Sequence, residues 1–386
     1  MAVIAGFTPA VESEGRQESL VLALQALSHF HAEAPARPAA GYDLIAALTG
    51  ISFMTATSFS QPCPAWWILG SRAVHLDFAA NAIGLNLTCL NKQPADLDFD
   101  GMQKFSREEI LPKIIREIEA GRPVLVNGGF PSFGWGLWGV ATRTEKEKIF
   151  GHTCWFQYEE QPMGEEYPAL AAYSIETRDR SKRIPIRDIL RNASSLYRNQ
   201  GEAGWTTGPR AYELWSDQVG QEFPCSEHGD EFPGCYRQMS SFVRDARMTG
   251  ARFLDFLNEE LPPPLRRFLP GIVDDNRAIA RLLKGVATAE DPSQILSTKG
   301  DRKKYQKVLD EVRSLEESLE KRYEELASQK GWDAPPTTKK KGKGDRKGKG
   351  QKRKGQGSKK DRREKKAVKK PEQTAKTWRK IADLSG

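Results

Sequence analysis

Basic side chains are concentrated at the C-terminal end of this 386-residue chain. Residues 331–386 contain 21 of the 59 Lys and Arg residues but only 6 of the 51 Asp and Glu residues, a net charge of +15. Because the whole chain carries a formal charge of +8, the part that precedes this segment carries −7. The C-terminal segment has few apolar side chains, so no burial offsets the roughly 1–2 kcal/mol of backbone entropy lost per ordered residue. The sequence predicts an acidic folded body followed by a disordered basic tail.

We expect this tail to bind a polyanion. Lys and Arg displace condensed counterions from a phosphate backbone, which gives a salt-dependent affinity for RNA or DNA of any base sequence. An anionic membrane or an acidic protein satisfies the same physics, and the alternative is a solubilising extension or a targeting-like basic run. Beyond residue 337 the only aromatic residue is Trp378, so the tail offers little stacking for single-stranded bases. The residues predicted to contact the polyanion are Lys339, Lys340, Lys341, Arg346, Lys347, Lys352, Arg353, Lys354, Lys359, Lys360, Arg362, Arg363, Lys365 and Lys366.

The N-terminal segment and the cysteine pattern predict a cytoplasmic protein. MAVIAGFTPAVESEG turns polar too early for a signal peptide, and no run of about 18 apolar residues predicts a transmembrane helix. The five cysteines show no dense repeating pattern, so reduced thiols are expected rather than a disulfide framework. GxxxxGK[ST] does not occur, and the GxGxxG spacing in GWGLWG (134–139) leads into a β-rich run rather than into a helix, which argues against nucleotide-dependent chemistry, and no cofactor is predicted.

Hydrophobic periodicity indicates the order of helices and strands in the body. Apolar residues at helical spacing, such as Leu20, Leu24 and Leu27, predict a first helix. SREEILPKIIREIEAG predicts an amphipathic helix with Ser106 as its N-cap and Gly121 at its C-terminal end. β-rich runs joined by short polar or glycine-rich turns predict an antiparallel sheet. The predicted helices are 17–33, 43–50, 75–84, 106–121, 184–198, 209–219, 235–260 and 272–285, and the predicted strands are 85–90 and the runs PVLVNGG, GLWGVATR and KIFGHTCWFQY.

Helices, a central antiparallel meander and further helices together indicate an α+β fold. We expect an α+β domain at 1–180, a helical portion of that domain or a second subdomain at 181–300, an amphipathic helix at 301–330, and the tail at 331–386. Within the amphipathic helix, residues 305–326 show a heptad seam about three repeats long, which either docks on the body or associates with a second copy. The seam residues are Tyr305, Val308, Val312, Leu315, Leu319 and Leu326, with polar Arg322 at the remaining step.

Several short motifs of the body resemble one known family. GYDLIAALTGISF is followed by QPCPAWW, by a helix that ends in AIGLNL, and by GRPVLVNGG with GLWGVAT. GPRAYELWSDQVG and HGDEFPGCYRQMSSFVRDARMTGARFLDFLNEEL continue the match. This arrangement, over roughly residues 4–290, resembles bacterial papain-like proteins of the type of butirosin biosynthesis protein H and the bacteriocin-processing cysteine peptidases. The resemblance implies a papain-like, cysteine-peptidase-like fold with an antiparallel central sheet and a helical C-terminal half.

The residues depart from a papain-like catalytic site. Such a site needs a Cys thiolate at a helix N-terminus and a His on a facing strand. Before the first helix stand Gln17, Glu18 and Ser19, and Trp135 occupies the position where the family presents its histidine. The sequence therefore favours a binding or accessory protein of papain-like fold without a conventional triad.

An alternative is a cysteine hydrolase or acyltransferase that uses Cys63 as its nucleophile. Pro62 and Pro64 restrict the backbone on both sides of this residue and would present the thiol rigidly. His152 or His75 would serve as the base, with an acid such as Asp77. The opposing interpretation is that Cys63 is a small packed loop residue and that His152 is an ordinary strand residue.

Two pairings of Cys and His have metal-ligand spacing. Cys225, His228 and Cys235 in PCSEHGDEFPGC supply two sulfurs and a nitrogen, but a closed zinc site takes four ligands, so a polar turn between helices is the competing interpretation. His152 and Cys154 are two residues apart and point to the same face of a strand, which makes a metal half-site at most. Trp66, Trp67, Trp135, Trp138 and Trp155 either line a groove or belong to the core.

Overall fold

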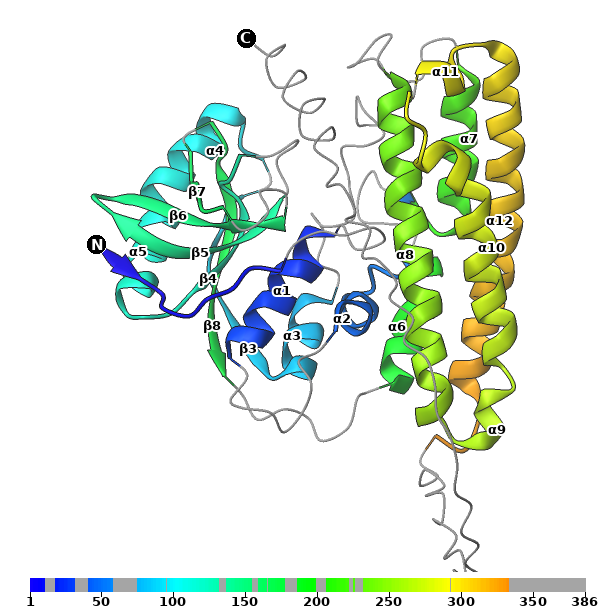
Figure 1. Cartoon of the computed structure of the whole chain (residues 1–386), viewed down its shortest axis with the longest axis horizontal. Helices are drawn as coiled ribbons and strands as arrows, with labels where there is room; N and C mark the ends of the chain where they lie inside the picture. Colours follow the sequence, from blue (N-terminus) through cyan, green and yellow to red (C-terminus); the bar gives the residue numbers. More distant parts are fainter. Residues whose placement is uncertain are drawn as a thin grey trace, which may run out of the picture. The chain divides into compact units, whose positions relative to one another are not determined.

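The structure is a computed structural model of the whole chain. It describes residues 1–10, 18–31, 41–57, 75–94, 96–131, 137–154, 159–164, 166–177, 186–198, 206–221, 225, 232–291 and 293–332. Met1–Thr337 form one compact unit, which is α+β: an antiparallel sheet with its helices is followed by a helical C-terminal half, as predicted (Figure 1). Among the described helices, none is both long and apolar enough to cross a bilayer.

The main sheet is antiparallel throughout, with the strand order β3-β8-β4-β5-β6-β7 and β1 paired with β5. Its strands are β1 (Ala2–Val3), β3 (Leu85–Lys92), β4 (Val124–Gly128), β5 (Trp138–Glu145), β6 (Lys148–Thr153), β7 (Gln161–Pro162) and β8 (Ala169–Thr177). The strands at 85–90 and in the three β-rich runs were predicted. β8 was not, although it lies between β3 and β4, because ALAAYSIET has few of the β-branched residues that indicate strands. A second, two-stranded sheet joins β2 (Ala56–Thr57) to β9 (Thr206–Thr207).

Helices cover both faces of the main sheet. The alternation of β4 sends Val124 and Val126 to one face, where they pack with Ile114 and Ile118 of α5 (Leu111–Glu119). Leu125 belongs to the core on the opposite face, with residues of α1 (Ser19–Phe30), α2 (Tyr42–Thr49) and α3 (Leu76–Ile83). That second core continues into the helical half, so the sheet and the bundle share one apolar interior.

The helix predicted at 106–121 starts earlier than expected. Its first segment is α4 (Phe99–Phe105), which is capped by Asp98, whose Oδ1 accepts a hydrogen bond from the Gly101 N–H at 2.8 Å. A π-helical turn, Ser106–Ile110, connects α4 to α5. Ser106 is therefore not an N-cap; its hydroxyl instead accepts a hydrogen bond from the Ala169 N–H of β8. The predicted C-terminal stop is correct, because Gly121 follows the helix in the left-handed region with φ 79°, a conformation that glycine adopts without strain.

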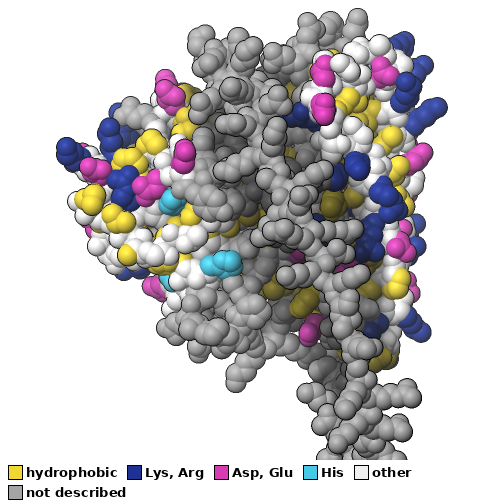
Figure 2. Space-filling view, viewed as in Figure 1, with side chains coloured by type: hydrophobic (Ala, Val, Ile, Leu, Met, Phe, Trp, Pro, Cys, Tyr) yellow, Lys and Arg dark blue, Asp and Glu magenta, His cyan; other side chains and the backbone are white. Residues whose placement is uncertain are grey.

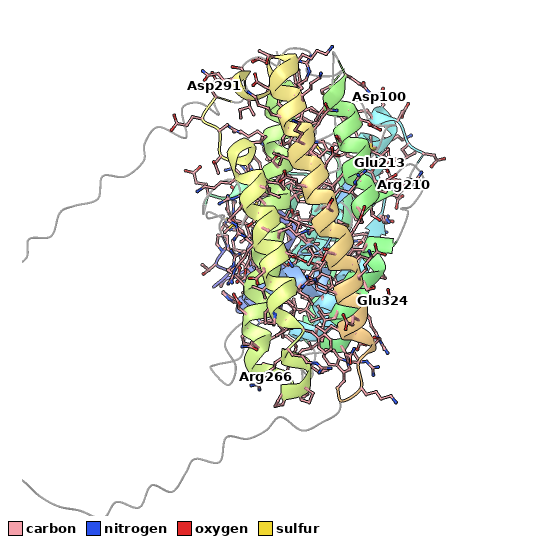
Figure 3. All side chains as sticks on the ribbon, turned by 90° about the vertical axis from the view of Figure 1, so that its right-hand side faces the viewer. Asp100, Arg210, Glu213, Arg266, Asp291 and Glu324 are labelled. Carbon is pink, nitrogen blue, oxygen red and sulfur yellow. The ribbon has the colours of Figure 1, made fainter. Side chains whose placement is uncertain are left out.

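The C-terminal half is a bundle of long helices. Figure 3 shows it from the side, with Asp291 at one end and Arg266 at the other. Its helices are α6 (Ile186–Arg198), α7 (Pro209–Gly220), α8 (Phe232–Glu260), α9 (Pro263–Arg266), α10 (Leu269–Ala287), α11 (Ser293–Leu296) and α12 (Lys299–Ser328). α12 packs against α6, α7 and α10, so the amphipathic helix docks within its own chain. Trp332, just after α12, is also buried in this core.

The buried seam of α12 differs from the predicted one by one residue at three steps. Tyr305, Val312, Leu319 and Leu326 are buried as predicted. At the other three steps the next residue along the chain is buried instead: Leu309, Glu316 and Tyr323 in place of Val308, Leu315 and Arg322. Val308 and Leu315 are partly buried and pack against the core.

Glu316 enters the core because a buried arginine binds it. Arg247 of α8 and Glu316 have fully buried side chains, and Arg247 Nε donates to Glu316 Oε1 at 2.7 Å. The other two guanidinium nitrogens donate to the Ser52 carbonyl and to Thr55 Oγ1. Tyr212 of α7 donates its phenol to Glu316 Oε1 at 2.8 Å. This network joins α7, α8, α12 and the segment after α2.

Candidate functional site

The N-terminal end of α1 carries a buried polar cluster. Glu18 precedes the first helical residue in an extended conformation, and its side chain does not cap the helix. Its backbone N–H donates to the Tyr42 phenol at 3.0 Å, and that phenol donates to Asp245 Oδ2 at 3.2 Å. The cluster joins α1, α2 and α8.

The Glu18 carboxyl group is buried and has a raised pKa. Its side chain is 3% exposed, and Oε2 has no hydrogen-bond partner among the described residues. Burial, together with the negative charge of Asp245, raises the pKa of Glu18 from 4.5 to about 8. Burial raises the pKa of Tyr42 most, and the charges of Asp245 and Glu18 raise it further. A thiolate nucleophile needs positive surroundings, and the described part of this cluster supplies acids instead.

Ser19, the next residue, has a structural contact. It is buried, and its Oγ accepts a hydrogen bond from the Trp138 N–H of β5 at 3.2 Å. The hydroxyl therefore attaches the start of α1 to the sheet. Trp138 itself is 3% exposed and belongs to the core, while Trp66, Trp67, Trp135 and Trp155 lie outside the described residues.

His152 lies on β6, opposite Val140 of β5, and lines an apolar hollow. Its ring stacks on Phe7 with centroids 5.6 Å apart, and its Nδ1 is buried without a hydrogen-bond partner in the described structure. Burial lowers the pKa of His152, although the charge of Glu160 opposes this effect. The buried Cys154 lines the same hollow, but the cavity measures only about 10 Å³. That is roughly the space of one water molecule.

His75 precedes α3 and is half-buried. Gly50 at the end of α2 has φ 84°, and a Cβ there would lie 3.2 Å from the His75 ring. The two elements therefore approach closely at a position that favours glycine. His75 Nε2 is buried without a described hydrogen-bond partner, and burial lowers the pKa of this imidazole. Asp77 lies in the first turn of α3 and is exposed. Cys63 lies outside the described residues, so its relation to either histidine stays a prediction.

The predicted metal cluster is brought together in part. The sulfurs of Cys225 and Cys235 lie 3.9 Å apart, and both side chains are buried. His228 lies outside the described residues. Within the residues that are described, no group of three or more His, Cys, Asp or Glu side chains is arranged to hold a metal ion. The predicted tail contacts from Lys339 to Lys366 also lie beyond the described part of the chain.

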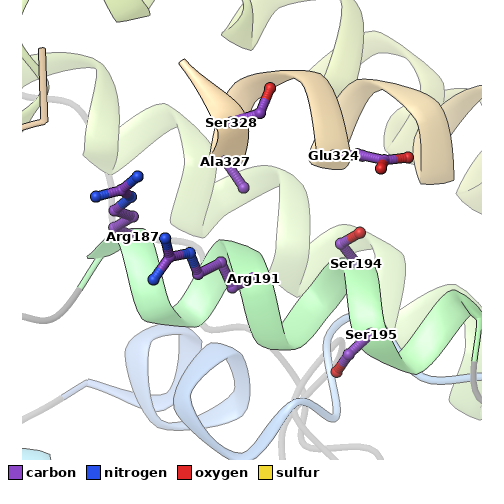
Figure 4. A pocket seen from close by; sticks show the side chains of 7 residues that line it. All are labelled: Arg187, Arg191, Ser194, Ser195, Glu324, Ala327 and Ser328. Atoms are coloured by element: carbon purple, nitrogen blue, oxygen red, sulfur yellow. The ribbon is translucent and has the colours of Figure 1, made fainter. Parts of the chain in front are cut away.

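A larger hollow, of about 560 Å³, lies between α6 and the C-terminal end of α12. Figure 4 shows Arg187 and Arg191 reaching from α6 towards α12, with Glu324 over the other end of the hollow. Arg191 Nη1 lies 3.8 Å from Asp188 Oδ1 of its own helix. The negative charges of Asp188 and Glu324 therefore offset the positive charges of Arg187 and Arg191. No candidate residue from the sequence lines this hollow. The signal available in the sequence was the spacing of Arg187 and Arg191, one helical turn apart.

Comparison with known proteins adds no further constraint: no protein-family model matches the chain, and no curated protein sequence is significantly similar to it.

Proposed function

We propose that this chain is a binding or accessory protein of papain-like fold, without a conventional catalytic triad, whose basic tail binds nucleic acid or another polyanion. The observation that carries the proposal is the separation of charge, +15 in residues 331–386 against −7 in the part that precedes them. The basic tail neutralises the charges of a polyanion and so binds it, whereas the net negative charge of the body repels it.

The α1 end of the body supports the non-catalytic part of this proposal. A helix packed on an antiparallel sheet is the framework that a papain-like site requires, and α1 packs on β5 in this way. At its N-terminus, however, Glu18 is a buried acid with a raised pKa, and Ser19 accepts a hydrogen bond from the sheet. These residues favour packing over nucleophilic chemistry.

The body also carries exposed cations of its own. Figure 2 shows Lys and Arg side chains at the edge of the view where α10 and α12 lie, interspersed with Asp and Glu. Arg281, Lys284, Lys303 and Lys307 are among the exposed basic residues of these two helices. Acidic neighbours weaken their field, so we expect a minor contribution to polyanion binding compared with the tail.

The decisive experiment measures binding of duplex DNA and of RNA at several salt concentrations. If about five or more phosphates are engaged, the slope of log K against log[salt] on duplex DNA should be steeper than about −4. A chain ending at Thr337 should lose this affinity. Trp332 is buried, so the truncation must spare it.

Two tail variants serve as matched controls. A tail of identical composition in shuffled order should retain both affinity and salt slope, because counterion release depends on charge and not on order. A tail with its Lys and Arg residues replaced by Gln should lose both. Undiminished binding by the chain ending at Thr337 would refute the role of the tail and point to the cations of α10 and α12.

A cysteine hydrolase or acyltransferase that uses Cys63 is the second candidate. It is favoured by the buried ring nitrogens of His75 and His152, which have no hydrogen-bond partner among the described residues, because lowered pKa values keep both imidazoles in the neutral form that a base requires. Selective alkylation of Cys63 by iodoacetamide at pH 6, lost in His75→Ala or His152→Ala, would establish this candidate. Slow labelling, as expected of a thiol with a pKa of about 8.5, would exclude it.

A further inference from the structure

Cys225 and Cys235 are two thiols that the fold brings close together. Cys225 lies between α7 and α8, and Cys235 lies in the first turn of α8. The two sulfurs are 3.9 Å apart, compared with about 2.05 Å in a disulfide bond. Each sulfur therefore needs to move by only about an ångström for a bond to form, a displacement that side-chain rotation can supply.

The two thiols by themselves suffice for a disulfide but not for a structural zinc site, which takes four ligands. Cys225 is 1% exposed and Cys235 is 7% exposed, so Cys235 is the more accessible of the two thiols.

We infer that Cys225 and Cys235 are a site of reversible oxidation, which a glutathione-type disulfide converts to an intramolecular disulfide bond. The Cys235 thiolate attacks the oxidant, forms a mixed disulfide and releases one glutathione thiolate. The Cys225 thiolate then attacks the Cys235 sulfur, closes the protein disulfide and releases the second glutathione. The protein loses two protons and two electrons, and the oxidant becomes two thiols.

Closure of this bond would link Cys225 covalently to the first turn of α8, a helix that packs on both α2 and α10. Cross-linking the unfolded chain at this point lowers its entropy, so the oxidised protein should unfold at a higher temperature. This site is independent of the basic tail and of the proposed binding function.

The test oxidises the full chain with graded ratios of oxidised to reduced glutathione and then maps its peptides. Trypsin leaves both cysteines in one peptide, residues 211–237, because no Lys or Arg lies between them. We expect this peptide to lose the mass of two hydrogen atoms and to resist alkylation. Cleavage after Glu227 should then leave the two halves joined until a reductant is added.

Cys225→Ser should trap glutathione on Cys235, and Cys235→Ser should prevent the reaction at Cys225. Cys89, which is exposed and not paired with a described cysteine, provides the matched control, and Cys89→Ser should oxidise like the parent chain. The inference is overturned if both thiols still alkylate after oxidation. It is also overturned if the purified protein holds stoichiometric zinc that is lost in Cys225→Ser. The alkylation and zinc measurements on the parent chain do not depend on whether the serine variants fold well.

Discussion

At the scale of single residues, the buried polar groups of this protein are compensated to very different degrees. Arg247 has described partners for three guanidinium nitrogens, and Glu316 Oε1 accepts two hydrogen bonds. Glu18 Oε2 and Glu316 Oε2 both lack a described partner. Arg247 compensates the charge of Glu316, whereas burial and the negative charge of Asp245 make ionisation of Glu18 costly and raise its pKa. The cost of burying Glu18 therefore depends on pH.

The parent protein should become less stable as the pH rises from acid to weakly alkaline values, and we predict that Glu18→Gln removes this pH dependence. With a pKa of about 8 in the folded state and 4.5 as the reference value, the folded protein binds the extra proton between these limits. The proton held by Glu18 stabilises the folded protein fully below the reference pKa. This contribution to the free energy of unfolding is lost as pH rises through the folded-state pKa, at about 1.4 kcal/mol per pH unit. Urea denaturation from pH 5 to 8 should show a steeper fall for the parent than for Glu18→Gln.

An exposed glutamate provides the control for this comparison. Glu324 lies on the surface of α12, and Glu324→Gln should leave the pH dependence of stability as steep as in the parent. If the stability curves of the parent and Glu18→Gln run parallel over this range, Glu18 is ionised in the folded state.

At the scale of elements, the position of α12 is decided by one ion pair as well as by apolar packing. The seam contains Leu309, Val312 and Leu319, but at Glu316 it relies on Arg247 of α8. A buried ion pair of this kind adds little to stability compared with apolar side chains of equal size, yet breaking it leaves one charge uncompensated. The pair therefore selects one rotation of α12 about its axis.

Removing either charge should destabilise the protein by about 3–5 kcal/mol, since the partner stays buried without compensation. We expect this loss for Arg247→Met and for Glu316→Gln, measured by urea denaturation. The double variant should lose much less than the sum, because neither charge is then buried alone. Additive losses in this cycle would contradict a coupling between the two residues.

A pair on the surface of the same helix is the matched control. Arg313 Nε and Glu317 Oε1 are 3.9 Å apart, and both side chains are substantially exposed. Because solvent screens such pairs, Glu317→Gln should change stability by less than about 1 kcal/mol.

At the scale of the whole molecule, the folded body extends slightly past the point at which the basic composition begins. Trp332 lies in the segment counted as tail by composition, yet it is 6% exposed and packs in the main core. A single large aromatic residue buries enough apolar surface to hold its segment in place.

We predict that two nearby truncations differ in stability. A chain ending at Thr337 should melt within about 1 °C of the full chain, whereas a chain ending at Gly331 should lose roughly 3 kcal/mol and melt several degrees lower. Trp332→Ala in the full-length chain should reproduce the second result, and calorimetry would measure all four proteins. Equal melting temperatures for the two truncations would show that Trp332 does not stabilise the body.

The amino-acid sequence alone determined the strongly periodic elements and the charge separation. The heptad spacing places a helix at 305–326, and the β-rich run PVLVNGG places β4, because both patterns depend on neighbours within one element. Tertiary structure decided what depends on distant partners. The strand β8, rich in alanine, exists because β3 and β4 pair with it on both sides. Tyr42 meets Asp245 across 203 residues, and Glu316 is buried because Arg247 lies opposite, which no local pattern encodes.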